Sequence, residues 1–218
     1  MSMIRILGID PGSRFTGFGV IESDGKKSSY ITSGVVRVTG ETLAERLKVI
    51  YECVNELVDT HQPDEMSIEK VFLHRNADSA LKLGQARGAA ICAVITSEIP
   101  VHEYTPAEIK QSVVGKGNAG KEQVQHMVRV LLNLQGNPQE DAADALAAAL
   151  CHGNTRQTLN FMANSIQAQN EKNTTSKLQN IATSNTIRIT RIGPIPQADI
   201  AVISLSLYIR PKAIKTAI

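Results

Sequence analysis

IRILGIDPGSRFTGFGVIES (residues 4–23) sets the architecture of the chain. Its first six residues are an apolar run rich in β-branched side chains, closed by a Pro-Gly turn, which predicts a buried strand. FTGFGVIES (15–23) and SYITSGVVRV (29–38) predict two further strands, and the linker Asp24-Gly25-Lys26-Lys27 predicts a hairpin between them. The chain therefore begins with three consecutive strands.

Helices and strands alternate after this opening. Apolar residues recur at three- and four-residue intervals from Leu43 to Val58, and Thr42 with Glu45 predicts a capping box at the start of that helix. Further helices are predicted near 77–97, 106–113, 121–134 and 138–151, and further strands at 65–71 and 101–104. Hairpin-linked strands followed by βαβ crossovers predict an α/β fold. We expect a mixed five-stranded sheet, three antiparallel strands and then parallel crossovers, with helices on both faces.

Composition limits the class of protein. The 218 residues are 42% hydrophobic, which is too apolar for a disordered chain. Residues 1–164 carry 16 Lys+Arg against 19 Asp+Glu (−3), and residues 165–218 carry 7 against 2 (+5), which together give the net charge of +2. The net charge by itself therefore does not indicate a nucleic-acid-binding protein. Three widely spaced cysteines, no signal-like N-terminus and no apolar run of membrane length predict a cytoplasmic protein.

The character of the sequence changes near its end. We expect one folded domain over residues 1–155, followed by a polar linker and basic tail over residues 156–218. Residues 199–209 regain apolar character, so this end is either a docking strand or the non-native sequence of an extended reading frame. These readings stay open.

Four carboxylates stand out by position. Asp10 ends the first strand, Glu69 lies near the end of the fourth, and Asp141 and Asp144 project from one side of a helix. Ligands of open α/β sheets gather at the carboxyl ends of parallel strands, where these acids could meet. Converging carboxylates need a cation, and oxygen-only ligation indicates Mg²⁺, with Mn²⁺ as a substitute. Two such ions, bridged by Asp10, would suit phosphodiester hydrolysis.

Some acidic residues in these segments also have a simpler interpretation. Asp10 could be a turn residue, and Glu69 could be a solvated residue at a strand end. Asn137 resembles a helix N-cap, with Glu140 as the partner in its capping box. Such capping does not explain Asp144, which lies a turn further into the helix among alanines.

Four collinear motifs resemble the RuvC-type crossover junction endodeoxyribonucleases, the Holliday-junction resolvases. They are GIDPGSRFTGFGVI (8–21), IEKVFLHRNADSALKLGQARG (68–88), KQSVVGKGNAGKEQVQHMV (110–128) and NPQEDAADALAAAL (137–150). The resemblance implies a ribonuclease-H-like nuclease domain in which Asp10, Glu69, Asp141 and Asp144 are the catalytic metal ligands. It implies a Mg²⁺-dependent homodimer that makes paired nicks in four-way DNA junctions during homologous recombination and DNA repair. These nicks leave 5′-phosphate and 3′-hydroxyl ends. Implied partners are a branch-migration helicase and a junction-binding protein, of the RuvB and RuvA types.

Several other side chains are candidate DNA contacts. Lys121 opens a helix behind a Gly-rich loop and would suit a phosphate, and the resemblance supports a DNA-contact role for Lys110 and Lys121. Phe72 by itself is more typical of a core residue, but the resemblance favours stacking on a base. Arg14 and Arg75 flank acidic positions and could neutralise phosphates or be plain surface residues. His74, His102, His126 and His152 lack ligand spacing with one another and are interpreted as structural or surface residues.

The small-residue-rich helix from Leu81 to Val94 is a candidate dimer surface, or it packs on the sheet. Parts of the sequence are also compatible with two other functions. The motif at 8–21 also resembles the first phosphate loop of the sugar-kinase and actin superfamily, but the chain has room for one such domain and that architecture needs two. A non-catalytic nucleic-acid-binding protein of the same fold would be favoured by loss of an acidic position, and none is lost.

Overall fold

The computed structural model describes residues 2–71, 77–156 and 158. The strands are β1 (Ile4–Asp10), β2 (Phe15–Ser23), β3 (Ser28–Arg37), β4 (Glu65–Glu69) and β5 (Val101–Tyr104). The helices are α1 (Leu43–His61), α2 (Ala77–Ile95), α3 (Pro106–Val114), α4 (Lys121–Leu131) and a helix over residues 140–156. Except for residues 156 and 158, the predicted linker and tail lie outside the described residues. No helix of the described part is long and apolar enough to cross a membrane.

The five strands form one mixed sheet in the order β3-β2-β1-β4-β5. β1, β2 and β3 pair antiparallel, while β4 pairs parallel with both β1 and β5. The predicted turn between β2 and β3 is confirmed: the Asp24 carboxylate accepts the backbone N–H groups of Lys26 and Lys27 at 2.8 and 2.7 Å. The predicted sheet is therefore confirmed in strand number and strand direction.

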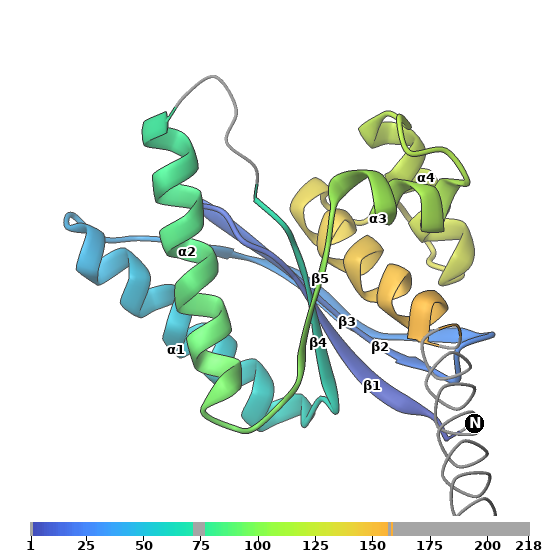
Figure 1. Ribbon diagram of the computed structural model, residues 1–218, viewed down its shortest axis with the longest axis horizontal. Coiled ribbons are helices and arrows are strands. Elements are labelled where there is room, and N and C mark those ends of the chain that lie inside the picture. Colours follow the sequence, from blue (N-terminus) through green and yellow to red (C-terminus); the bar gives the residue numbers. More distant parts are fainter. Residues whose placement is uncertain (1, 72–76, 157, 159–218) are drawn as a thin grey trace, which may run out of the picture. The chain divides into compact units, whose positions relative to one another are not determined.

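Helices cover both faces of the sheet, as Figure 1 shows. Side chains alternate along β1, so Ile6 belongs to one hydrophobic core and Leu7 to the other. The core around Leu7 includes α1 and α2, and the core around Ile6 includes α3, α4 and the 140–156 helix. The central strand is thus buried on both sides, which explains its continuous apolar run.

One predicted helix start is wrong. The last described helix begins at Glu140, and its first backbone bond runs from the Ala143 N–H to the Gln139 carbonyl at 2.8 Å. Gln139, not Asn137, therefore occupies the N-cap position. The residues before it serve another contact, because the Pro138 carbonyl accepts the Gln125 side-chain amide at 2.6 Å and ties this segment to α4.

Candidate active site

Two of the four acids end neighbouring parallel strands. β1 and β4 pair in register from Ile6 with Glu65 to Ile9 with Ile68, so Asp10 and Glu69 follow paired residues at the same edge of the sheet. Both side chains are half-buried there. The strand-end geometry predicted from the sequence is confirmed for this pair.

Glycines in the sheet allow the other two acids to reach this edge. A Cβ at Gly17 would lie 2.0 Å from the Asp141 carbonyl oxygen, and a Cβ at Gly8 would lie 2.0 Å from that of Ala145. The alanine-rich 140–156 helix therefore rests directly on β1 and β2 without intervening side chains. Gly17 is also the β-sheet partner of Asp10, so the first turn of this helix is held next to Asp10.

A cavity of about 250 Å³ lies between these elements. Asp10, Glu69 and Asp144 line it together with Lys110 of α3 and Lys121 of α4. Asp141 does not line the cavity, but its charge acts on both Asp10 and Asp144. Four acids from three distant segments of the chain are thus brought into one electrostatic environment.

The carboxylates destabilise one another in their ionised forms. Burial, reinforced by the charges of Asp144, Glu69 and Asp141, raises the pKa of Asp10 from 3.8 to about 8. Burial also raises the pKa of Glu69 and of Asp144, and neighbouring acids add to both shifts. Lys121 opposes all three shifts. A divalent cation would supply the missing positive charge, and this oxygen-only donor set fits Mg²⁺ or Mn²⁺.

Lys121 also has an acidic partner of its own outside the cavity. Its ammonium group donates a hydrogen bond to Oε1 of Glu140, the first residue of the 140–156 helix. This contact is the main reason that the pKa of Lys121 is raised. Lys110 is half-buried at the cavity wall, and its positive charge opposes the rise in the pKa of Glu69 and of Asp144.

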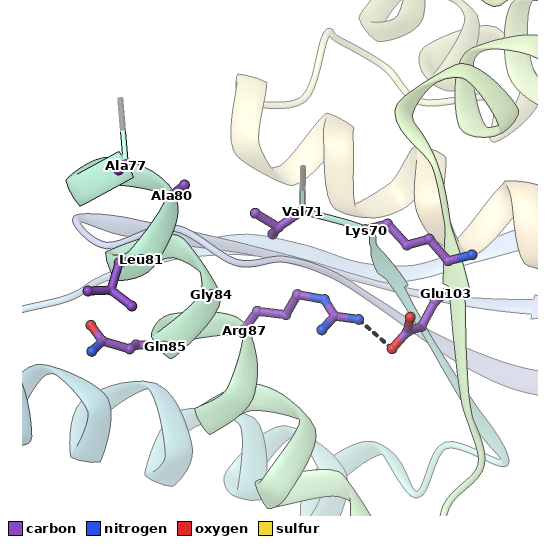
Figure 2. A pocket seen from close by; sticks show the side chains of 9 residues that line it. All are labelled: Lys70, Val71, Ala77, Ala80, Leu81, Gly84, Gln85, Arg87 and Glu103. Carbon is purple, nitrogen blue, oxygen red and sulfur yellow. Dashed lines mark ion pairs between the residues drawn. The ribbon is translucent and has the colours of Figure 1, made fainter. Parts of the chain in front are cut away.

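A basic residue of α2 contacts the strand that carries Glu69. Arg87 of α2 donates from Nε to the backbone carbonyl of Glu69 at 3.2 Å and forms an ion pair with Glu103 of β5. Figure 2 shows this ion pair at the wall of a cavity of about 820 Å³ between α2 and the ends of β4 and β5. Lys70 and Val71 also line a smaller neighbouring cavity that reaches Asp10 and Glu69. The two cavities therefore share Lys70 and Val71 as lining residues, and the larger extends toward α2 while the smaller extends toward the acids.

Sequence reasoning missed a buried polar network under the far end of the 140–156 helix. The buried ring of His152 shares hydrogen bonds with the Tyr104 hydroxyl, at 2.7 Å, and with the Glu65 carboxylate, and Arg156 donates to Glu65 at 3.0 Å. Burial alone would raise the pKa of Glu65, but the bonds from His152 and Arg156 outweigh it and lower that pKa. No spacing in the sequence signals this network, because its members come from β4, β5 and the 140–156 helix.

The same network contains a set of metal-type ligands. One candidate ligand atom from each of Glu65, His102 and His152 lies within 4.8 Å of the other two. Among the described residues, the carboxylates of the acidic site form no set of three that is as close. The rings of His102 and His152 stack with centroids 4.1 Å apart, and both nitrogens of His152 already face partners. The Nε2 atoms of His102 and His152 both face the Glu65 carboxylate oxygen Oε2, that of His102 at 3.6 Å. Because this carboxylate already joins β4 to the 140–156 helix, we interpret the set as a contact that holds the helix to the sheet.

Two other candidate residues that the structure describes do not line the cavity. Arg14 is exposed in the turn between β1 and β2 and does not line it. His126 is exposed on α4. Phe72, His74 and Arg75 lie outside the described residues.

Comparisons with known proteins place this geometry in a family. The family model "Crossover junction endodeoxyribonuclease RuvC" matches residues 6–152. A RuvC of Hahella chejuensis is 61% identical over 157 residues, covering 72% of this chain and 91% of the relative. Thermus thermophilus RuvC in complex with Holliday junction substrate superposes with a TM-score of 0.68 and 35% identity over 71% of this chain and 96% of that one.

The fold alone extends further. The yeast mitochondrial Holliday junction resolvase Ydc2 shares it at a TM-score of 0.54 and 13% identity, over 75% of this chain and 85% of that one. The ribonuclease-H-like architecture expected from the motifs is thereby confirmed. Because the family model spans most of the described domain and the identity to the Hahella protein is high, this chain belongs to the RuvC family of crossover junction endodeoxyribonucleases.

Proposed function

We propose that Asp10, Glu69, Asp141 and Asp144 are the catalytic acids with which this junction-resolving hydrolase cuts DNA. The protein is a crossover junction endodeoxyribonuclease that acts in DNA recombination and repair. The observation that supports the residue assignment is the convergence of Asp10, Glu69 and Asp144 on one cavity that two lysines also line, with Asp141 close enough to act electrostatically on Asp10. The family membership argues against a sugar-kinase-like phosphotransferase and against a non-catalytic binding protein.

Divalent-metal dependence follows from the family, and we propose Mg²⁺ as the ion, with Mn²⁺ as a substitute and two ions at each site. The bound ions would activate water and stabilise the leaving oxygen. Asp10 is the natural shared ligand, because each of the other three acids acts on it electrostatically. The protein's own task is to hold the four carboxylates on rigid strands and a helix, so that little rearrangement is needed.

Lys121 and Lys110 would contact the DNA backbone. Both line the cavity, and the positive charge of each opposes the rise in the pKa of Glu69 and Asp144. A phosphate that enters the cavity would meet these ammonium groups, which would place the scissile phosphorus near the acids and balance its negative charge. The two nicked strands would carry 5′-phosphate and 3′-hydroxyl ends.

Paired nicks require two active sites, and we propose that α2 forms the contact of a homodimer. Leu81 and Ile95 on this helix are 62% and 57% exposed. Between them, a Cβ at Gly84 or Gly88 would meet no atom within 4 Å, and Cys92 is exposed. This α2 outer face, made by Leu81, Gly84, Gly88, Cys92 and Ile95, is apolar at both ends and small in the middle, which suits close helix packing across a two-fold axis.

The dimer proposal is tested by Gly88→Arg. The long side chain fits the open space on a monomer but would block a close helix contact. We expect analytical ultracentrifugation to show a monomer, while Thr60→Arg at an exposed position of α1 leaves the dimer intact. A dimeric Gly88→Arg protein would contradict the assignment of this face.

We also propose cytoplasmic function beside a junction-binding protein and a branch-migration helicase of the RuvA and RuvB types. All three cysteines are unpaired, as is typical of a reducing compartment. Co-sedimentation on a four-way junction with each partner type would test the association.

The central experiment compares a synthetic four-way junction with linear duplex of the same sequences, each with Mg²⁺ or with EDTA. We expect Mg²⁺-dependent paired nicks in the junction alone. Asp10→Asn should still bind the junction and lose at least about a hundredfold in cleavage rate, since metal-ion catalysis supplies several kcal/mol. Asp59→Asn, on the exposed surface of α1, is the matched control. Cleavage by Asp10→Asn at the parental rate would overturn the assignment of the acids.

A further inference from the structure

The ion pair between Lys121 and Glu140 presents a conflict for DNA binding. The ammonium group that would meet a phosphate already donates to a carboxylate of this chain. Glu140 comes from the first turn of the 140–156 helix, and Lys121 comes from the first turn of α4. Both side chains are largely exposed, at 59% and 68%, so both can rotate without unfolding anything.

Glu140 resembles a phosphodiester in the chemistry that Lys121 recognises. Each carries a single negative charge on oxygen acceptors, and each would form a charge-assisted hydrogen bond with the ammonium group. An exposed ion pair of this kind contributes at most about 1 kcal/mol, so an incoming phosphate can displace it. Glu140 also lies at the edge of the acidic site, where its charge raises the pKa of Asp144.

We propose that Glu140 is an internal competitor for the DNA phosphate, which occupies Lys121 in the free protein and must release it when the junction strand enters the cavity. This inference rests on the proposed DNA-contact role of Lys121. Glu140 therefore sets the affinity of the site from outside the catalytic acids. It disfavours every binding mode in which the contact of Lys121 with DNA is weaker than the ion pair of Lys121 with Glu140.

Displacement of an internal partner has a measurable ionic signature. When Lys121 exchanges Glu140 for a phosphate, the freed carboxylate lies close to the DNA and is repelled by it, and salt screens this repulsion. Without the Glu140 charge this partial compensation is lost. The plot of log affinity against log salt should then become steeper, by less than the value of about 0.9 that one whole phosphate contact contributes.

The experiment measures junction affinity by fluorescence anisotropy in EDTA, over a series of salt concentrations, for the parent and Glu140→Gln. We expect Glu140→Gln to bind the junction about two- to fivefold more tightly at low salt, which corresponds to loss of an exposed ion pair. Glu122→Gln is the matched control, because Glu122 is exposed in the first turn of α4 and the same charge is removed. It should give a smaller gain and a smaller change in salt dependence.

Lys121→Gln separates this inference from the proposed function. In that background, Glu140→Gln should change affinity no more than Glu122→Gln does, because the competitor has lost its target. Equal effects of Glu140→Gln and Glu122→Gln in the parent, or a gain that persists without Lys121, would overturn the competitor role. If Lys121→Gln leaves junction affinity unchanged, both the DNA contact and the competitor role are wrong. Mg²⁺-dependent cleavage by the parent would still support the four acids in either case.

Discussion

Replacement of Asp10 should stabilise the metal-free protein while it removes activity. Folding raises the pKa of Asp10 from 3.8 to about 8, so between these pH values the folded protein holds a proton that the unfolded chain has released. The contribution of Asp10 to stability is therefore fully present below about pH 4 and is lost as the pH rises through about 8. Asp10→Asn mimics the protonated acid and cannot ionise, so it keeps this contribution at every pH.

The structure also gives the size of the effect. The difference between 3.8 and about 8, at roughly 1.4 kcal/mol for each pH unit, sets an upper limit of about 6 kcal/mol. Relaxation and water penetration around an ionised carboxylate reduce such a cost, so we expect about 2–3 kcal/mol at pH 8.5. For a domain of this size the change corresponds to a rise of about 5–10 °C in Tm.

The assay is thermal unfolding of the parent and of Asp10→Asn in EDTA, from pH 5 to pH 8.5, repeated with Mg²⁺. The difference in Tm should be small at pH 5 and grow with pH, and Mg²⁺ should then stabilise the parent more than the variant. Asp59→Asn, exposed on α1, should show neither trend. A difference that is independent of pH, or an Asp10→Asn protein less stable than the parent at pH 8.5, would refute the reasoning.

Two further predictions concern how the 140–156 helix is seated. Gly17→Ala places a methyl group 2.0 Å from the Asp141 carbonyl oxygen. We therefore expect a loss of about 1–3 kcal/mol in the free energy of unfolding by urea and a larger proportional loss of cleavage rate. Gly136→Ala, where a Cβ meets no atom within 4 Å, should be neutral in both assays. Unchanged cleavage by Gly17→Ala would show that the helix position is not critical. Ser67→Ala removes the buried 2.7 Å bond to the Ala148 carbonyl and should cost about 1–3 kcal/mol in the same unfolding assay, with a loss below 0.5 kcal/mol arguing that water replaces the hydroxyl.

The sheet and its acidic edge could be predicted because their signals are local or follow from topology. The apolar run that ends at Asp10 predicts a buried strand, and parallel pairing predicts that Glu69 ends beside it. The capping box of Thr42 and Glu45 is confirmed, because both of its hydrogen bonds are present. It could be predicted because these bonds lie within four residues of sequence. Each of these features depends on neighbours in the chain or on one rule of sheet geometry.

The rest could not be predicted because it depends on contacts between distant segments. Gly17 looks like an ordinary strand glycine until the 140–156 helix is seen against it. The helix starts at Glu140 and not near Asn137, and the Pro138 carbonyl instead accepts a hydrogen bond from Gln125 of α4, a tertiary contact that local capping preference does not reveal. The pairing of Glu65 with His152 likewise joins residues 87 positions apart.

The order of the acids along the chain has a consequence for protein synthesis. Asp10 and Glu69 emerge early from the ribosome, whereas Asp141 and Asp144 lie on the last described helix. Ser67 of β4 holds that helix to the sheet through the Ala148 carbonyl. A nascent or truncated polypeptide that stops before residue 140 has the strands but only Asp10 and Glu69 of the four proposed catalytic acids. On the proposed assignment such a fragment would lack a complete site, so cleavage would require synthesis of the domain through its last described helix.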